Sequence, residues 1–158
     1  MIEQFFPELK RYTQEFVSQY GYVAIFLISF TESLFQPIPP YPFIVSAPLF
    51  KLSVYIAGLV AFLGNLLGAL VAYYLATFLG SAFVKHFLGE RLYLKGESIF
   101  NKYGFFAVIL GEPYKLVCWL SGIFKMPVMT FLVASAIARG LRISAFVFFG
   151  NLLERFVR

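Results

Sequence analysis

Long apolar stretches alternate along the chain with short breaks that contain proline or charged residues. Residues 53–79 carry no charged side chain, and about 20 predominantly apolar residues are enough for a helix to cross a bilayer. Within this stretch Gly64, Gly68 and Ala72 recur at four-residue spacing, which lets a neighbouring helix approach closely. Residues 127–150 are also long enough to span. The pattern predicts an all-α integral membrane protein with two membrane-spanning helices.

The apolar region before each predicted span is broken in its middle. Proline clusters in the first break, and an acidic residue followed by proline forms the second; the predicted breakers are Pro37, Pro39, Pro40 and Pro113. Proline ends a helix because it has no N–H group and its ring clashes with the preceding turn. The return arm over residues 43–50 would reach only about 12 Å as a helix, against a hydrocarbon thickness of about 30 Å. Each broken region is therefore predicted to form a re-entrant hairpin.

The two halves of the chain repeat. Residues 20–27 resemble residues 103–110, and residues 48–51 resemble residues 122–125. A re-entrant hairpin returns to the side it came from, so each repeat crosses the membrane once, an odd number of crossings. The second copy is therefore predicted to be inserted upside down, as in inverted-topology repeats. The alternative treats each proline break as a kink within one long crossing, which would make the repeats parallel.

The whole chain, residues 1–158, is thus predicted to form a single membrane domain with repeats at 20–79 and 103–151. Residues 1–19 place their apolar side chains on one helical stripe, the pattern of an amphipathic helix that lies in the membrane interface. Residues 80–102 mix basic and apolar side chains and are predicted to be an interfacial linker.

Composition excludes an ordinary soluble domain. The chain is 60% hydrophobic and only 13% charged, against about 25% charge in a typical soluble protein. The net charge of +5 comes from scattered residues and not from a basic run, so anionic lipid surfaces are the expected partner and nucleic acid is not. All eight acidic residues are glutamate and Cys118 is the single cysteine, so neither a metal site, a cofactor nor an internal disulfide is expected.

Glu32 is the candidate for proton coupling. It lies in an otherwise uncharged stretch over residues 16–50, directly before the proline-rich break. A carboxylate at membrane depth is costly unless it is paired or protonated. In the alternative interpretation, Glu32 lies near the interface or accepts hydrogen bonds from backbone amides at the hairpin tip.

Arg139 and Arg142 are the candidate ligands for an anion. They are three residues apart and Ser135 is four before Arg139, so all three share one helical face. Arginine grips phosphate with a bidentate fork, which suits the headgroup of an anionic lipid. The alternative pairs the two arginines with Glu32 and Glu112 across the repeat interface.

The second break supplies a further candidate, Lys115, beside Glu112. A cation at a broken helix end could contact an anionic headgroup, or the two residues could form an ion pair that neutralises both charges. Cys118 and Trp119 are interpreted as packing residues or interface anchors. No Ser–His–acid set is expected to converge at membrane depth, no glycine-rich phosphate loop follows a strand, and no metal-ligand spacing occurs, so an enzyme is not expected.

Three motifs together resemble a known family. They are Glu32-Ser33 before Pro37-Ile38-Pro39-Pro40, then Pro113-Tyr114-Lys115 leading to Gly122 and Met126, and finally Phe131, Ser135, Arg139-Gly140 and Arg142. This set resembles the DedA superfamily, also called the VTT or SNARE-associated domain, and looks closest to its YqaA-like branch. The better-studied branch has an arginine on either side of the second-hairpin proline; here Lys115, Arg139 and Arg142 are the available cations.

The resemblance implies a bacterial inner-membrane fold of two re-entrant hairpins packed with spanning helices. It also implies translocation of undecaprenyl phosphate or phospholipids between leaflets with dependence on the proton gradient, and Glu32 matches the family's hairpin carboxylate. Two other functions stay open from the sequence: a transporter of protons or small ions, and a membrane scaffold whose buried charges only specify helix pairing. Homo-oligomerisation is also open.

Overall fold

The computed structural model describes residues 20–34, 39–111 and 114–157, and within this part every regular element is helical. The first described helix covers Tyr20–Leu34. The elements that follow are α2 (Tyr41–Ser46), the 3-10 turn η1 (Ala47–Phe50), α3 (Val54–Leu75), the π-helical turn η2 (Ala76–Gly80), α4 (Ser81–Leu88), α5 (Glu90–Leu110), α6 (Tyr114–Ile123) and α7 (Val128–Val157). The predicted amphipathic helix over residues 1–19 lies outside the described residues.

Within the described residues, two helices are long and apolar enough to cross a membrane, Val54–Gly80 and Val128–Phe156. Both predicted spans are therefore present as helices close to their expected bounds. Neither span contains proline and both are rich in apolar residues, which allows each helix to continue for many turns even though the second also carries Arg139 and Arg142. Many large apolar side chains on these helices are exposed, among them Leu59, Leu63 and Leu67, as expected for a surface that faces lipid.

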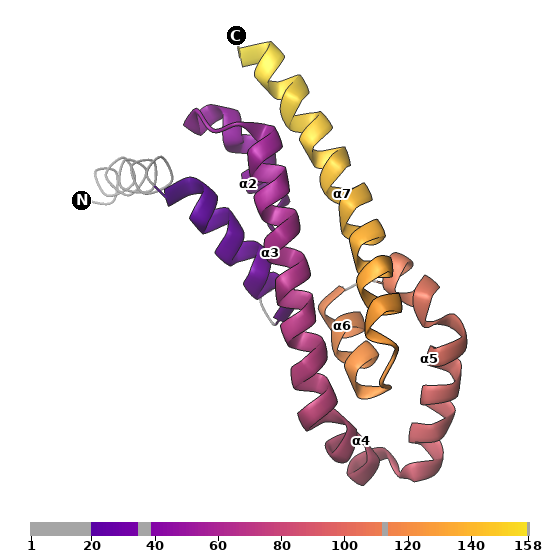
Figure 1. Ribbon diagram of the computed structural model, residues 1–158. Helices are drawn as coiled ribbons and strands as arrows, with labels where there is room; N and C mark the ends of the chain where they lie inside the picture. The colour runs from indigo at the N-terminus through magenta and orange to yellow at the C-terminus, as the bar shows by residue number, and fades with distance from the viewer. Residues whose placement is uncertain (1–19, 35–38, 112–113, 158) are drawn as a thin grey trace, which may run out of the picture.

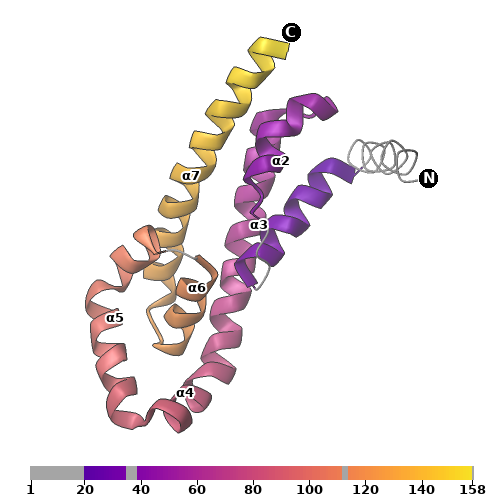
Figure 2. The ribbon, with the colours of Figure 1, turned by 180° about the vertical axis from the view of Figure 1, so that it is seen from behind.

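The remaining helices approach the middle of the molecule in two pairs (Figures 1 and 2). The helix Tyr20–Leu34 runs from one end of α3 to its middle, and α2 returns beside α3 toward the same end. From the other end, α5 rises from α4 to mid-length and α6 turns back. The two long helices α3 and α7 run in opposite directions, and α7 extends beyond α3 at the C-terminal end.

The second arm of each pair ends in the same backbone turn. Lys51 and Lys125 have φ angles of 60° and 50° and are the non-glycine residues with positive φ in the described part of the chain. In both turns the lysine N–H donates to the carbonyl three residues back, at 3.1 Å, and the next N–H donates to the carbonyl five residues back. These are the two hydrogen bonds of a Schellman cap. The sequence match between residues 48–51 and 122–125 thus corresponds to one conserved turn geometry within the chain.

Packing crosses between the halves. The short helix α2 packs against α7, and α6 packs against α3. The helix Tyr20–Leu34 instead lies against α3 at two glycines, because a Cβ at Gly64 would lie 2.6 Å from the Phe26 carbonyl oxygen and one at Gly68 2.1 Å from that of Phe30. The close approach expected from the small-residue stripe is therefore made at these two positions.

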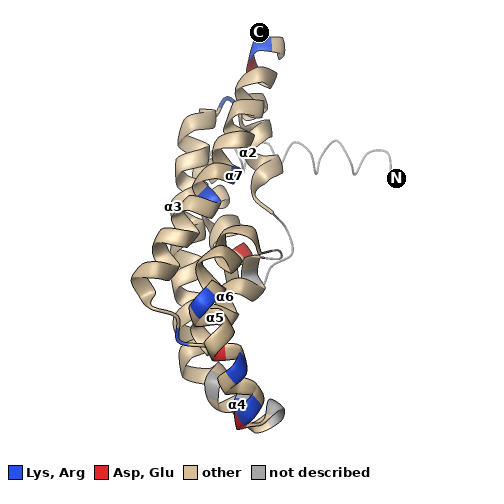
Figure 3. Cartoon of the chain, turned by 90° about the vertical axis from the view of Figure 1, so that its right-hand side faces the viewer, with Lys and Arg blue, Asp and Glu red and all other residues tan. Residues whose placement is uncertain are grey.

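Residues 80–102, predicted as an interfacial linker, are largely helical: they form α4 and the first half of α5. Tyr93 of α5 is buried and its hydroxyl donates to the Ile123 carbonyl at 2.7 Å, while Lys85 of α4 lies over its ring. Burial raises the pKa of the Tyr93 hydroxyl, so this donor stays neutral. Figure 3 shows that charged residues gather around α4 and the start of α5, whereas α3 carries none.

Candidate functional site

The centre of the molecule holds a buried ion pair that joins its two halves. Arg139, in the middle of α7, is 1% exposed, and its Nη2 donates to Glu32 Oε1 at 3.2 Å. Its Nη1 donates to the Tyr41 hydroxyl, and its guanidinium carbon lies 3.6 Å from the centre of the Tyr114 ring, a cation–π contact. The guanidinium is therefore enclosed by three side chains from three different helices.

The break points place these partners. Glu32 lies in the last turn of the helix Tyr20–Leu34, Tyr41 is the first residue of α2, and Tyr114 is the first residue of α6. Each is thus at the helix end that faces the middle of the molecule, where the two helix pairs meet alongside α7. The proline breaks bring the ends of both pairs to one arginine.

Several polar atoms around the ion pair are buried without a hydrogen-bond partner among the described residues. They are Glu32 Oε2, Arg139 Nε, the Tyr114 hydroxyl and the Ser135 hydroxyl. Ser135 precedes Arg139 by one turn, and its side chain lies beside the Tyr114 hydroxyl. Two hydroxyls and a guanidinium N–H are donors that a phosphate group accepts from.

Holding this pair away from water is costly. The cost of desolvating two charges is often larger than their attraction, so a buried ion pair is weak evidence for a stabilising role. Ionisable residues in an apolar interior are instead interpreted by default as part of a functional site. Glu32 keeps 14% of its side-chain surface accessible and Arg139 only 2%. The Glu32 side chain is therefore the less enclosed of the two, although its Oε2 atom is itself buried.

The helix end that carries Glu32 is anchored at three successive residues. While Glu32 contacts α7, the Ser33 hydroxyl donates to the Asn65 side-chain oxygen of α3 at 2.8 Å. The Trp119 indole N–H of α6 donates to the Leu34 carbonyl at 2.9 Å. Three helices therefore fix the position of the carboxylate.

Of the predicted site residues, the structure brings Glu32, Ser135 and Arg139 together. Arg142 lies one turn further along α7 and is partly exposed. Lys115 follows Tyr114 in α6, and its side chain is outside the described part of the structure, as are Glu112, Pro113 and Pro37. Of the remaining breakers, Pro39 is exposed, and Pro40 is buried and directly precedes α2.

Sequence reasoning did not select Tyr41, Tyr114 or Asn65 as site residues. The chain has ten tyrosines, so neither Tyr41 nor Tyr114 can be singled out from the sequence by residue type alone. Asn65 was detectable, because it is an amide in the middle of a predicted apolar span, where polar side chains are expensive.

The fold and site define a helical membrane protein with a charged centre between two spanning helices. Comparison with known families gives a match to the VTT domain over residues 38–152. The chain belongs to this family, the DedA-type membrane proteins.

Three relatives support this assignment. The chain is 31% identical over 137 residues to an uncharacterised protein of Methanocaldococcus jannaschii, covering 84% of this chain and 86% of the relative. It is 29% identical over 153 residues to the uncharacterised membrane protein YbfM of Bacillus subtilis, covering 89% and 94%. It is 27% identical over 140 residues to undecaprenyl phosphate transporter A of Staphylococcus aureus, covering 78% and 69%. No solved structure gives a significant match.

Proposed function

We propose that this protein moves an anionic lipid, a polyprenyl phosphate or a phospholipid, between the leaflets of its membrane. The observation that carries the proposal is the buried Arg139–Glu32 pair, surrounded by hydroxyl donors that lack partners among the described residues. A relative in the same family is named undecaprenyl phosphate transporter A, and that name supports a lipid phosphate as substrate.

The proposed topology is a pair of inverted repeats, each a re-entrant hairpin and one spanning helix. Three features support it: the helix pairs approach the middle from opposite ends, their second arms end in equivalent turns at Lys51 and Lys125, and each second arm packs on the other half's spanning helix. Transport sites in such folds lie near the membrane midplane, where broken helices meet.

In the proposed mechanism, Glu32 balances the charge of Arg139 while no lipid is bound. A phosphate headgroup takes the place of the carboxylate on the guanidinium fork and accepts hydrogen bonds from Ser135 and Tyr114. In the proposed coupling, Glu32 accepts a proton when the phosphate displaces it from the guanidinium. Neutralising the headgroup lowers the barrier to crossing while the lipid tails stay in the bilayer.

The other predicted residues have accessory roles in this proposal. Arg142 extends the cationic face of α7 by one turn, and Lys115 and Glu112 lie at the second break, where Lys115 contacts the headgroup after its pair with Glu112 opens. Proton coupling belongs to the same proposal and rests on Glu32.

A reconstituted system tests the proposal. Purified protein in phosphatidylcholine vesicles with fluorescent phosphatidylglycerol should expose inner-leaflet lipid to a membrane-impermeant quencher. We expect Arg139→Gln to abolish this movement, and Arg91→Gln, at an exposed position of α5, to retain it. The double variant Glu32→Gln/Arg139→Gln removes both charges, so its loss of movement cannot be ascribed to an unpaired buried charge.

Two results would contradict the proposal. Wild-type lipid movement in both the single and the double variant would leave the ion pair as a packing device, as in a scaffold. Proton flux in vesicles with a pH-sensitive dye, without lipid movement, would instead favour an ion transporter.

A further inference from the structure

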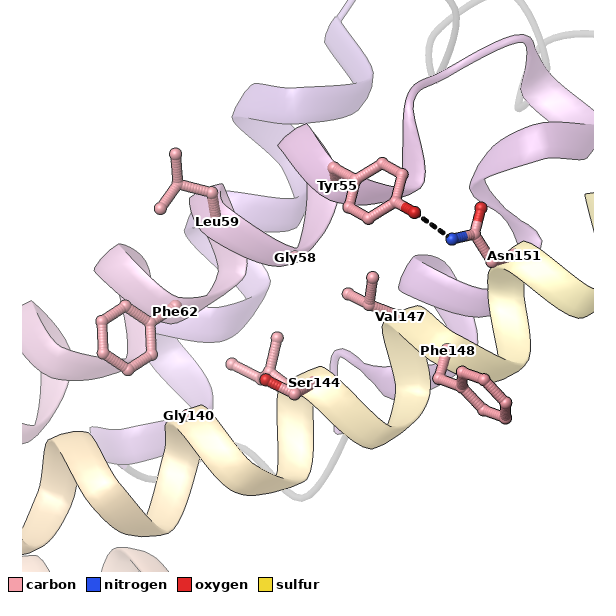
Figure 4. A pocket seen from close by; sticks show the side chains of 10 residues that line it. Tyr55, Gly58, Leu59, Phe62, Gly140, Ser144, Val147, Phe148 and Asn151 are labelled. Atoms are coloured by element: carbon pink, nitrogen blue, oxygen red, sulfur yellow. Dashed lines mark hydrogen bonds between the residues drawn. The ribbon is translucent and has the colours of Figure 1, made fainter.

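An open groove lies between α3 and α7 on the side of the molecule that runs from Arg139 toward the C-terminal end of α7. It has a volume of about 530 Å³, and Figure 4 shows its walls. We name it the α3–α7 groove and define it by Gly58 and Phe62 of α3, Gly140, Ser144 and Val147 of α7, and the Tyr55–Asn151 pair at its end.

The groove is open at Gly140, whereas at Gly58 the two helices are in contact, because a Cβ there would lie 2.4 Å from Val147 Cγ2. A Cβ at Gly140 would have only Phe62 within reach, at 3.8 Å, so this position opens into the groove. Its rims are apolar and exposed: Leu59 is 60% and Phe148 63% accessible. Among the described residues, α3 and α7 belong to the two helices long and apolar enough to cross a membrane, so we expect an exposed apolar groove between them to face lipid chains.

The inner end of the groove adjoins the charged site. Gly140 directly follows Arg139, and the lining residue Ile143 is one helical turn beyond it on the same face. From Gly140 to Asn151 the helix rises about 17 Å, roughly half of a hydrocarbon thickness of about 30 Å. The groove therefore has the length of one leaflet, measured from the depth of Arg139.

The outer end is polar and basic. Asn151 donates a hydrogen bond to the Tyr55 hydroxyl across the groove (Figure 4). Exposed Lys51 precedes α3, and exposed Arg155 follows Asn151 by one turn, whereas Glu154 is the acidic residue of α7. The balance of these charges is positive, which attracts an anionic headgroup and repels the same end of a second copy of the chain.

We infer that the α3–α7 groove binds the hydrocarbon chain of an anionic lipid whose headgroup lies at the Tyr55–Asn151 end. This inference rests on the proposed function and gives it an access route: the lipid is held one leaflet deep, with its chain directed toward Arg139. Ser144, halfway along the groove, offers a hydroxyl to a headgroup that moves inward.

Photocrosslinking tests this inference. Wild-type protein in phosphatidylcholine vesicles receives phosphatidylglycerol with a diazirine in its acyl chain, and labelled peptides are located by mass spectrometry. We expect labelling at Phe62 and Val147, and less from a phosphatidylcholine analogue with the same chain. Ser144→Phe should lower groove labelling about tenfold, the effect of excluding roughly two methylene groups. Ala145→Phe adds the same ring at the adjacent exposed position outside the groove and should leave labelling unchanged.

Three outcomes would overturn the inference. Labelling that is uniform over α3 and α7, or equal in Ser144→Phe and Ala145→Phe, would show that the groove does not hold the chain. A disulfide between two copies of Ser144→Cys would assign the groove to a dimer interface. Because labelling measures occupancy and the quencher assay measures movement, normal lipid movement with a failed labelling pattern would refute the groove and leave the proposed function standing.

Discussion

At the scale of single residues, the Arg139–Glu32 pair shows which parts of the site can be predicted from the sequence and which cannot. Both residues can be identified as candidates from the sequence alone, because a charged residue in an apolar stretch is rare and energetically costly. Their contact with each other cannot be identified in this way, since they are 107 positions apart in the sequence. The Tyr41 and Tyr114 contacts depend wholly on where the helix ends meet, so no local pattern identifies them.

The buried pair makes a stability prediction. Glu32→Gln leaves the Arg139 guanidinium without a counter-charge, and breaking one side of a buried pair costs about 3–5 kcal/mol. We expect a lower unfolding midpoint in detergent, and partial recovery in Glu32→Gln/Arg139→Gln, where neither charge remains. Glu90→Gln at an exposed position of α5 is the control and should change little. Equal midpoints for Glu32→Gln and Glu90→Gln would show that the pair contributes nothing to folding.

At the scale of elements, apolar length and proline position predicted the helices well. The spans at Val54–Gly80 and Val128–Phe156 follow from long, predominantly apolar and proline-free sequence, and α2 begins directly after Pro40. The start of α5 at Glu90 could not be read from the apolar pattern, because its first turns alternate charged and apolar residues and are held by tertiary contacts such as Tyr93 with Ile123.

Two glycines in the spanning helices should respond oppositely to alanine. At Gly68 a Cβ would lie 2.1 Å from the Phe30 carbonyl oxygen, so Gly68→Ala must push the helix Tyr20–Leu34 away, at a cost of about 1–3 kcal/mol. At Gly140 the nearest atom is 3.8 Å away, and alanine is a better helix former than glycine by about 0.5–1 kcal/mol. Thermal unfolding of both variants in one detergent checks the order, and a more stable Gly68→Ala would contradict the packing.

At the scale of the whole molecule, the proposed inverted topology places the two equivalent turns on opposite sides of the membrane. Lys51 and Lys125 are exposed and belong to helix pairs that enter from opposite ends. With Cys118 replaced by alanine, Lys51→Cys and Lys125→Cys should react with a membrane-impermeant maleimide from opposite sides of intact vesicles. Ala145→Cys, within the span, should stay unlabelled. Labelling of both turns from the same side would favour parallel repeats.

The exchange of short arms between the halves has a consequence for the origin of this architecture. Because α2 packs on α7 and α6 on α3, each half supplies a short helix that packs against the long helix of the other. In the proposed inverted topology, a polypeptide of half this length would leave these packing surfaces uncovered, and pairing with an identical copy inserted the other way up would cover them. In that proposal the present chain corresponds to a fused form of such an antiparallel pair, with α4 connecting the two halves.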